Sequence, residues 1–250
     1  MKDHFSRQAA QYRASRPDYP AALLDFLAAA AAGRGRALDC ATGSGQAAIG
    51  LASRFAEVVA TDLSVAQLAR APACPNVRYV AATAERLPLA GASVDLVTVA
   101  QALHWLDLPA FYAEVRRVAR PGALVAAWSY GRMRVDAAVD AVVERLYSDV
   151  VGPYWPPGRE HVENGYRDLP FPFSPVPAPA FAMVAEWRLE RLLGYLASWS
   201  AVQRYEAQSG RDPLDAVRDA LHAAWGDPGT ARRVEWPLAL RVGAISPPSP

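Results

Sequence analysis

Two glycines and a carboxylate lie close together in the first third of the chain and predict a nucleoside site. Residues 37–51, ALDCATGSGQAAIGL, read as a short apolar strand, a glycine loop and the start of a helix. Gly43 and Gly45 let the backbone turn tightly and let a ligand approach where a Cβ would collide. The helix after them offers unpaired N–H groups to a negatively charged ligand. Asp62, at the tip of the next apolar strand (58–61), is placed to accept both hydroxyls of a ribose.

Asp39, just before the glycine loop, bears on which nucleoside binds. Residues 43–48, GSGQAA, also fit the Gly-x-Gly-x-x-Ala dinucleotide fingerprint. A carboxylate at Asp39 would repel a pyrophosphate but suits the ammonium of an amino-acid moiety, either directly or through water. S-adenosylmethionine (SAM) carries that ammonium, a ribose and an adenine, and has no phosphate. Here the chain resembles the class I SAM-dependent methyltransferases. An NAD(P)-type oxidoreductase is the alternative function. For Asp39 itself, the alternative role is to cap the glycine turn.

The resemblance implies further contacts with the cofactor. Leu63 packs on the adenine or belongs to the core. Thr83, Ala84 and Glu85, before Leu-Pro, resemble the adenine-edge motif, although Thr83 stands where an aspartate often binds the adenine amino group. A hydroxyl accepts that bond more weakly, the N–H of Ala84 can still serve the ring, and Glu85 is alternatively a solvated acid. Gln101 is a further candidate.

Two residues near the N-terminus resemble positions that cover the cofactor and reach its carboxylate. They are Tyr12 and Arg16, on a predicted amphipathic helix that Pro17 stops. Arginine suits a carboxylate through its fork of donors. The alternative for both is a solvated helix face.

The segment 101–107, QALHWLD, follows the fourth predicted strand and lies beside the methyl-transfer centre in the resembled fold. Methyl transfer from a sulfonium is an in-line displacement, so the protein mainly supplies proximity, alignment and a dry site. His104 is the candidate general base or polar substrate contact, with a hydrogen-bonded structural role as the alternative. Trp105 is a pocket wall or a core residue.

The elements around these residues alternate between strand and helix. Strands are predicted at 37–40, 57–61, 77–81, 93–100 and 123–128, and helices at 21–32, 46–55, 63–71 and 109–118. Such alternation predicts right-handed crossovers and an α/β fold with a doubly wound parallel sheet. Further elements are expected at 135–150 (helix), 183–192 (strand), 194–208 and 213–225 (helices) and 234–242 (strand). The resemblance implies that the last two strands complete a seven-stranded, mostly parallel, Rossmann-like sheet whose last strand is antiparallel.

We expect one methyltransferase domain spanning residues 1–250. Its predicted parts are N-terminal helices over the cofactor (1–34), the SAM-binding core (35–130), a lid or substrate insertion (131–182) and C-terminal strands and helices that complete the sheet (183–245). The insertion is dense in proline and aromatic residues, which is not typical of a sheet interior. Tyr154 and Trp155 within it are candidate substrate contacts.

A narrower likeness bears on the substrate. Residues 5–6, 16–20, 98–105 and 194–202 look like the trans-aconitate-methyltransferase-like and embryo-abundant-like enzymes, which implies small-molecule acceptors, often carboxylic acids. A carboxylate nucleophile needs no base, and His104 would then orient the acceptor. Four arginines in or near the insertion can hold a second carboxylate, or are ordinary surface charge: Arg132, Arg134, Arg159 and Arg167.

Composition narrows the functional classes to which the chain can belong. The 250 residues are 52% hydrophobic with a formal net charge of +1, and we find no basic stripe, so we expect no nucleic-acid partner. Cys40 and Cys74 form neither a disulfide framework nor a metal cluster, and no metal is expected. The polar start and the short apolar helix at 21–32, interrupted by Asp25, predict a soluble, cytoplasmic protein without membrane attachment. Oligomeric state is left open.

Two absences bear on the acceptor. The Asn/Asp-Pro-Pro-aromatic motif of amino-methylating nucleic-acid enzymes does not follow the fourth strand, and there is no double-Glu loop of protein arginine methyltransferases. The sequence therefore predicts a SAM-dependent methyltransferase that releases S-adenosylhomocysteine (SAH) and methylates a small organic molecule, on oxygen rather than nitrogen. A SAM-binding protein that kept the fold without the chemistry is the non-enzyme alternative.

Overall fold

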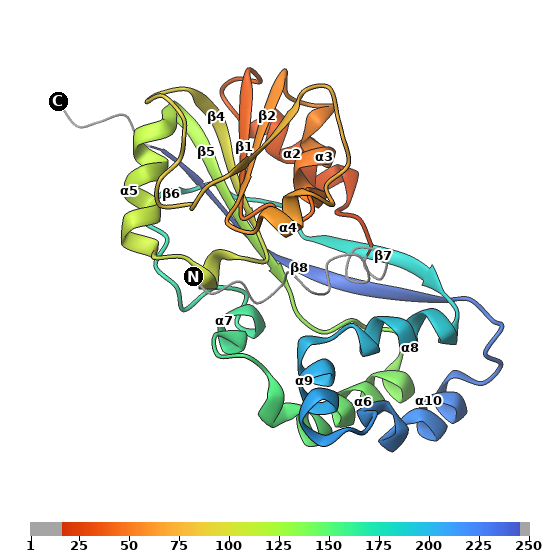
Figure 1. The fold of residues 1–250 in the computed structure, drawn as a ribbon. Helices are drawn as coiled ribbons and strands as arrows, with labels where there is room; N and C mark the ends of the chain where they lie inside the picture. Colours follow the sequence, from red (N-terminus) through yellow and green to blue (C-terminus); the bar gives the residue numbers. More distant parts are fainter. Residues whose placement is uncertain (1–16, 246–250) are drawn as a thin grey trace.

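A mixed eight-stranded sheet forms the centre of the molecule (Figure 1). The computed structural model describes residues 17–245. The strands are β1 (Arg36–Cys40), β2 (Glu57–Asp62), β3 (Val77–Ala81), β4 (Val94–Ala100), β5 (Ala119–Tyr130), β6 (Ser174–Pro175), β7 (Phe181–Trp187) and β8 (Arg232–Ala244). Their order is β3-β2-β1-β4-β5-β8-β6, with β7 also paired to β8. Strands β1 to β5 are parallel, and β8 runs antiparallel to β5. The predicted doubly wound, mostly parallel sheet with an antiparallel last strand is confirmed.

The sheet has eight strands rather than the predicted seven because two segments between residues 174 and 187 each pair with β8. β6 pairs with the last residues of β8, and β7 pairs with its first half, from Arg232 to Leu238. Between them lies the sequence Val176-Pro177-Ala178-Pro179. The N–H of Val176 still donates to the carbonyl oxygen of Val242 at 2.9 Å. Because proline lacks the N–H that a ladder needs, pairing stops at Pro177 and Pro179 and resumes at Phe181.

Helices cover both faces of the parallel strands. On one face α2 (Ala21–Ala30) and α3 (Gln46–Ala52) pack against side chains of β1, β2 and β5. On the other face α5 (Leu108–Val118) packs its Phe111 and Val115 against the alternate side chains. Strand β4 is buried from Val94 to Val99 because it is covered on both sides, as its continuous apolar run predicts.

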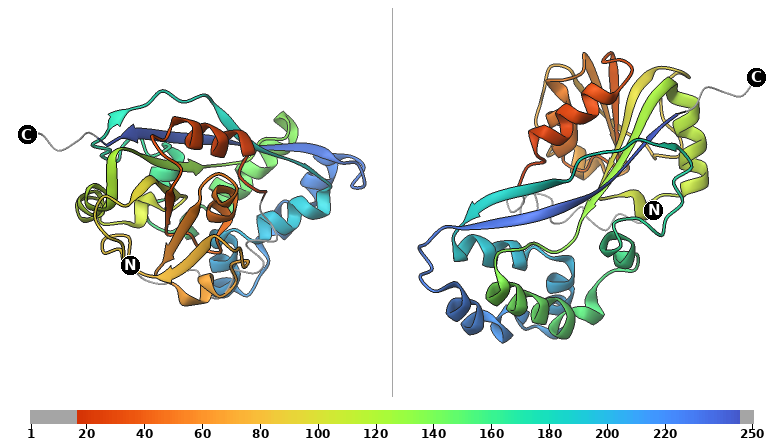
Figure 2. Two further views of the ribbon diagram at one scale, coloured as in Figure 1. Left: turned by 90° about the horizontal axis from the view of Figure 1, so that it is seen from above. Right: turned by 180° about the vertical axis from the view of Figure 1, so that it is seen from behind.

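A second, helical lobe lies beside the amino half of β8 (Figure 2). It contains α6 (Ala137–Arg145) with its π-helical continuation Leu146–Val150, α8 (Leu189–Ala197), α9 (Ser200–Ser209), a 3-10 turn (Pro213–Ala216) and α10 (Arg218–Trp225). One hydrophobic core joins these helices to β7 and β8, with Trp187, Tyr195 and Trp236 packed ring to ring. The lobe therefore combines helices from the predicted insertion (131–182) and from the predicted C-terminal part, instead of forming one contiguous lid.

Several boundaries differ from the sequence expectations. The predicted strand 183–192 ends at Trp187, because Leu189, Leu192 and Leu196 fall at helical spacing and bury one face of α8. The predicted helix 63–71 shortens to α4 (Val65–Leu68). The predicted helix 4–16 lies outside the described residues.

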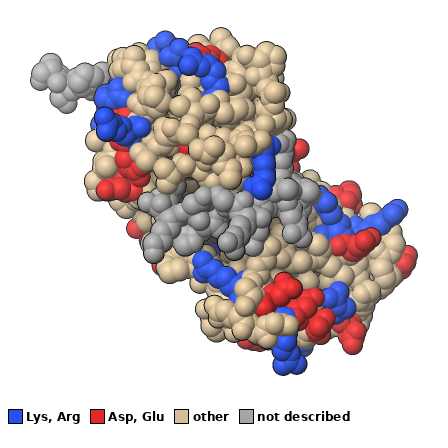
Figure 3. Space-filling view, in the orientation of Figure 1, with Lys and Arg blue, Asp and Glu red and all other residues tan. Residues whose placement is uncertain are grey.

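The molecular surface carries acidic and basic side chains side by side on the face shown in Figure 3. Among residues 17–245 no helix is long and apolar enough to cross a membrane.

Candidate active site

The glycine loop between β1 and α3 is held in a left-handed conformation. Gly43 has φ 58° and Gly45 has φ 82°, values that favour glycine. A Cβ at Gly45 would lie 2.6 Å from the hydroxyl of Tyr79, whereas a Cβ at Gly43 would meet no atom of residues 17–245 within 4 Å. Among these residues the loop is therefore packed against the protein at Gly45 and open at Gly43, where its backbone is accessible to a ligand.

Asp39 is buried beneath this loop, with 1% of its surface exposed. Its Oδ2 accepts a hydrogen bond from the hydroxyl of Thr42 at 2.5 Å, and its Oδ1 accepts one from Thr98 at 2.7 Å. Burial raises the pKa of this carboxyl to about 6. The hydrogen bond from Thr42 is the contact expected if Asp39 caps the glycine turn. A contact between Asp39 and the methionine ammonium stays a prediction.

Asp62 stands at the end of β2 and faces the glycine loop. Its Oδ2 accepts the N–H of Gly43 at 2.8 Å, and its Oδ1 accepts the N–H of Ser64 at 2.8 Å. These bonds fix the plane of the carboxylate. The contact of this carboxylate with ribose hydroxyls stays a prediction. The neighbouring Leu63 is 37% exposed and is not a core side chain.

The 83–85 segment lies beyond β3, along the same edge of the sheet. Thr83 forms an isolated bridge with Arg86, and the side chain of Ala84 is buried. Glu85 Oε1 accepts the N–H of Asp107 at 3.1 Å, which ties this segment to the loop after β4. Its role at the adenine stays a prediction.

Gln101 follows β4 in a left-handed conformation, with φ 57°. Its Nε2 donates to the carbonyl oxygen of Tyr130 at 2.9 Å, so its Oε1 points the other way. That Oε1 is buried, and no hydrogen-bond donor reaches it within the described part of the chain. A strained residue with an unsatisfied buried acceptor is typical of a ligand site.

His104 lies one turn further on, in the 3-10 turn Leu103–Trp105. Its Nδ1 lies 3.1 Å from the hydroxyl of Tyr166, and its ring packs on those of Trp105 and Tyr166. Burial, with the positive charge of Arg159 nearby, lowers the pKa of His104 to about 4. The imidazole is therefore neutral at neutral pH.

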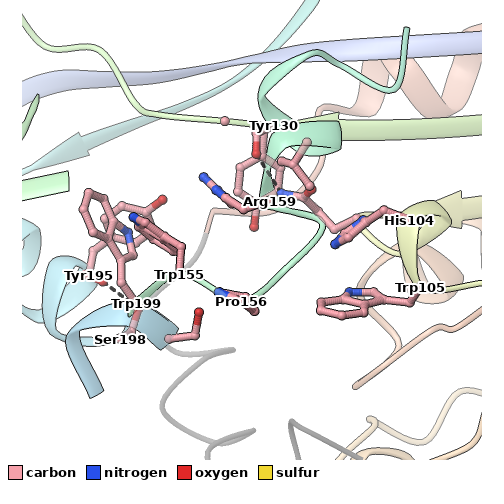
Figure 4. A pocket seen from close by; sticks show the side chains of 13 residues that line it. His104, Trp105, Tyr130, Trp155, Pro156, Arg159, Tyr195, Ser198 and Trp199 are labelled. Atoms are coloured by element: carbon pink, nitrogen blue, oxygen red, sulfur yellow. Dashed lines mark hydrogen bonds between the residues drawn. The ribbon is translucent and has the colours of Figure 1, made fainter. Parts of the chain in front are cut away.

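A cavity joins the end of β4 to the helical lobe (Figure 4). Its lining brings together four predicted site residues and a predicted lid arginine: Gln101, His104, Trp105, Trp155 and Arg159. In Figure 4 Arg159 lies between the aromatic cluster of Trp155, Tyr195 and Trp199 on one side and His104 on the other. The remaining lining residues are Tyr130, Gly131, Pro156, Val162, Tyr195, Ser198, Trp199 and Ser200. We call this space the aromatic cavity.

Other predicted residues lie elsewhere. Tyr154 does not line the aromatic cavity as described, because its ring packs on Tyr205 of α9. Asp39, Gly43, Gly45 and Asp62 lie at the carboxyl ends of β1 and β2, next to β4 in the sheet. We call these four, with Leu63 and residues 83–85, the cofactor edge. Tyr12 and Arg16 lie outside the described residues.

The cavity lining also includes residues that the sequence did not predict as site residues, among them Tyr130, Tyr195, Ser198 and Trp199. The last three belong to the stretch 194–202, which carries part of the subfamily likeness. That likeness was a usable signal, although it assigned no role to the individual side chains.

The cofactor edge and the neighbouring Gln101 fit SAM. The backbone at Gly43 can lie against the amino-acid part of SAM, the carboxylate at the end of β2 suits its ribose, and the Oε1 of Gln101 can accept a hydrogen bond from it. When bound, SAM supplies an activated methyl group on a sulfonium.

Comparison with known proteins identifies the family. A model described as "Methyltransferase domain" matches residues 38–127. A Dictyostelium discoideum protein named as a methyltransferase is 32% identical over 227 residues, covering 89% of this chain and 86% of its own. A solved structure described as a type II methyltransferase, from Anaeromyxobacter dehalogenans, is 51% identical, with a TM-score of 0.89, and covers 93% of this chain and 99% of its own.

A third relative matches a shorter stretch of the chain. It is a malonyl-[acyl-carrier protein] O-methyltransferase of Dechloromonas aromatica, 42% identical over 96 residues, which are 38% of this chain and 36% of that protein. These matches favour the methyltransferase interpretation over the dinucleotide one. The chain belongs to the class I SAM-dependent methyltransferases and is a methyltransferase enzyme.

Proposed function

We propose that this enzyme binds SAM along the cofactor edge and transfers its methyl group to an oxygen of a small organic molecule held in the aromatic cavity. The observation that carries this proposal is the position of the cavity. It begins at Gln101 and His104, at the end of the central strand β4, and aromatic rings of the helical lobe line its other side. A concave site with apolar walls and a few polar groups suits a small molecule.

The chemistry of His104 supports an oxygen acceptor. A neutral imidazole against Tyr166 can orient a polar group by a hydrogen bond. With a carboxylate acceptor the nucleophile is already ionised, and no proton has to be removed. The relative named as an O-methyltransferase also supports oxygen as the methylated atom.

Cofactor binding is tested first by calorimetry with SAM, SAH and NAD in parallel. We expect the two sulfur nucleosides to bind and NAD not to bind. Selective binding of NAD would overturn the proposal.

The acceptor is tested with SAM labelled in its methyl group and a panel of small carboxylic acids, hydroxyl compounds and amines, with the methylated products identified by mass spectrometry. Methyl esters release their label in mild base, whereas methyl ethers and methylamines retain it. Label found only on nitrogen or carbon would overturn oxygen methylation. Denatured enzyme provides the background.

A further inference from the structure

The aromatic cavity contains a guanidinium. Arg159, the first residue of α7 (Arg159–Glu163), lines it together with Trp105, Trp155 and Trp199. Its side chain is 22% exposed. Aromatic faces by themselves attract cations as well as flat apolar groups. A fixed positive charge among them repels a second cation and favours an anion.

Tyr147 holds this arginine in place. It lies in the π-helical turn Leu146–Val150, a distortion that frequently marks functional sites. Arg159 Nε donates to the hydroxyl of Tyr147 at 2.7 Å, and the guanidinium carbon lies 5.5 Å from the centre of its ring. The Tyr147 carbonyl oxygen accepts from Trp155 Nε1 at 3.1 Å, and the guanidinium also stacks on Trp155 at 4.7 Å. One residue therefore orients both Arg159 and Trp155.

Within the described residues the charge of Arg159 is incompletely balanced. The carboxylate that lies within 4.0 Å of it there is that of Glu163, whose Oε1 lies 4.0 Å from Nε and accepts the hydrogen bond of the Tyr147 hydroxyl. Within residues 17–245 the hydrogen bond of Arg159 uses Nε, and none uses its terminal NH₂ groups. Two parallel N–H donors on a half-buried guanidinium match the two oxygens of a carboxylate.

The other arginines considered for this role are placed differently. Arg132 pairs with Glu144 and stacks on the ring of Tyr147. Arg134 and Arg167 are exposed and are not in the cavity lining described here. Arg159 thus combines burial, a fixed orientation and access to the cavity.

We propose that Arg159 is the anion anchor of the acceptor site, and that the acceptor is a small aromatic acid. Its carboxylate pairs with the terminal NH₂ groups of Arg159, its flat body lies among Trp155, Trp199 and Tyr195, and a second group, the methylated oxygen, lies toward His104. This inference rests on the proposed function. It deepens that function, because it requires an anion separate from the methylated oxygen.

The test compares three probes of one shape and different charge: 3-(4-hydroxyphenyl)propanoate, its amide, and 3-(4-hydroxyphenyl)propylamine. Binding to the SAH-loaded enzyme is followed by tryptophan fluorescence, which needs no turnover. We expect the acid to bind at least about tenfold more tightly than the amide, as for a hydrogen-bonded charged group, and the amine to bind most weakly. Equal binding of acid and amide, or no binding of any probe, would overturn the proposal.

Variants assign the preference to one side chain. Arg159→Gln is expected to remove the acid-over-amide preference while the amide still binds, and Arg159→Lys to keep part of it as a point charge without a fork. Tyr147→Phe keeps the ring but loses the hydroxyl, so an intermediate preference is expected. Arg167→Gln is the matched control and should match wild type. An undiminished preference in Arg159→Gln would contradict the assignment.

SAH titration of wild type and each variant distinguishes a failure of the proposed function from a failure of the role proposed for Arg159. If the wild-type enzyme did not bind SAH, the proposed function itself would be wrong. Intact SAH binding without any acid preference would count against Arg159 alone.

Discussion

The cofactor edge and the aromatic cavity are built on different principles. At the cofactor edge the residues lie in the last positions of parallel strands or in the loops after them, and Asp62 binds nearby backbone at Gly43 and Ser64. The cavity instead draws Tyr130, Trp155, Arg159 and Tyr195 from three separate parts of the chain, and ring packing positions Trp155, Arg159 and Tyr195. The first region is therefore fixed by local sequence and the second by tertiary packing.

This difference indicates that cofactor binding and acceptor selection depend on different regions of the molecule. A sheet edge with a glycine loop can bind the same cofactor in many enzymes, because backbone and strand ends supply the contacts. The acceptor is selected by side chains on a lobe with a hydrophobic core of its own. Four experiments test whether the two regions are as separate as the structure indicates, beginning with the largest expected effect.

Core truncations in each lobe should separate the two binding functions. Leu38 of β1 and Leu192 of α8 are both completely buried. We expect Leu→Ala at either position to lower the free energy of unfolding by about 2–5 kcal/mol. Only Leu38→Ala should also weaken SAM binding, because β1 carries Asp39, while Leu192→Ala should weaken acceptor binding.

Urea denaturation and calorimetry with SAH, at a temperature where both variants are folded, measure these effects. If Leu192→Ala weakened SAH binding as much as Leu38→Ala, the two lobes would not be separable in this sense.

The two regions should also respond to pH with opposite sign. Burial raises the pKa of Asp39 from 3.8 to about 6, so its contribution to stability is present below pH 4 and is lost as pH rises to about 6. For His104, whose pKa falls from 6.5 to about 4, the contribution is present above pH 6.5 and is lost as pH falls to about 4. Each contribution is about 3 kcal/mol at full extent.

Asp39→Asn and His104→Gln remove these groups one at a time. Between pH 4 and 6.5 the stability of wild type relative to Asp39→Asn should fall with rising pH, and relative to His104→Gln it should rise. Chemical denaturation at four or five pH values measures both differences. Parallel curves for the three proteins would show that neither group titrates across this range.

Replacing the ribose acid should affect the cofactor edge alone. We expect Asp62→Asn to weaken SAM binding about 10- to 100-fold, since hydrogen bonds to a charged group contribute about 1.5–3 kcal/mol. Glu57→Gln, at the opposite end of the same strand, is the matched control and should leave SAM binding unchanged. Calorimetry with SAM distinguishes the two, and unchanged affinity in a folded Asp62→Asn would remove Asp62 from the site.

The same division explains what the sequence could predict. Strand order, the glycine loop and the residues after β1, β2 and β4 follow from apolar runs and turn residues that are local in sequence. The contact between Tyr147 and Arg159 was not predictable, because it depends on a π-helical turn and on how α6 packs in the core of the helical lobe. The end of β7 at Trp187 was missed for another reason, since the alternation of apolar and charged residues in β7 continues past Trp187 through Arg188, Leu189 and Glu190 into α8.

Leu63 offers the smallest and most local test of the cofactor edge. Its side chain is 37% exposed, so truncation leaves no buried cavity, and the free energy of unfolding should change by less than about 0.5 kcal/mol. If an adenine covers this side chain, Leu63→Ala exposes apolar surface in the complex and should weaken SAM binding about fivefold, or roughly 1 kcal/mol. Val184→Ala, a comparably exposed apolar residue on β7, should leave SAM binding unchanged. Equal SAM affinity of the two variants would mean that Leu63 is surface exposed without a cofactor contact, and the adenine would have to lie further along the edge, toward Thr83.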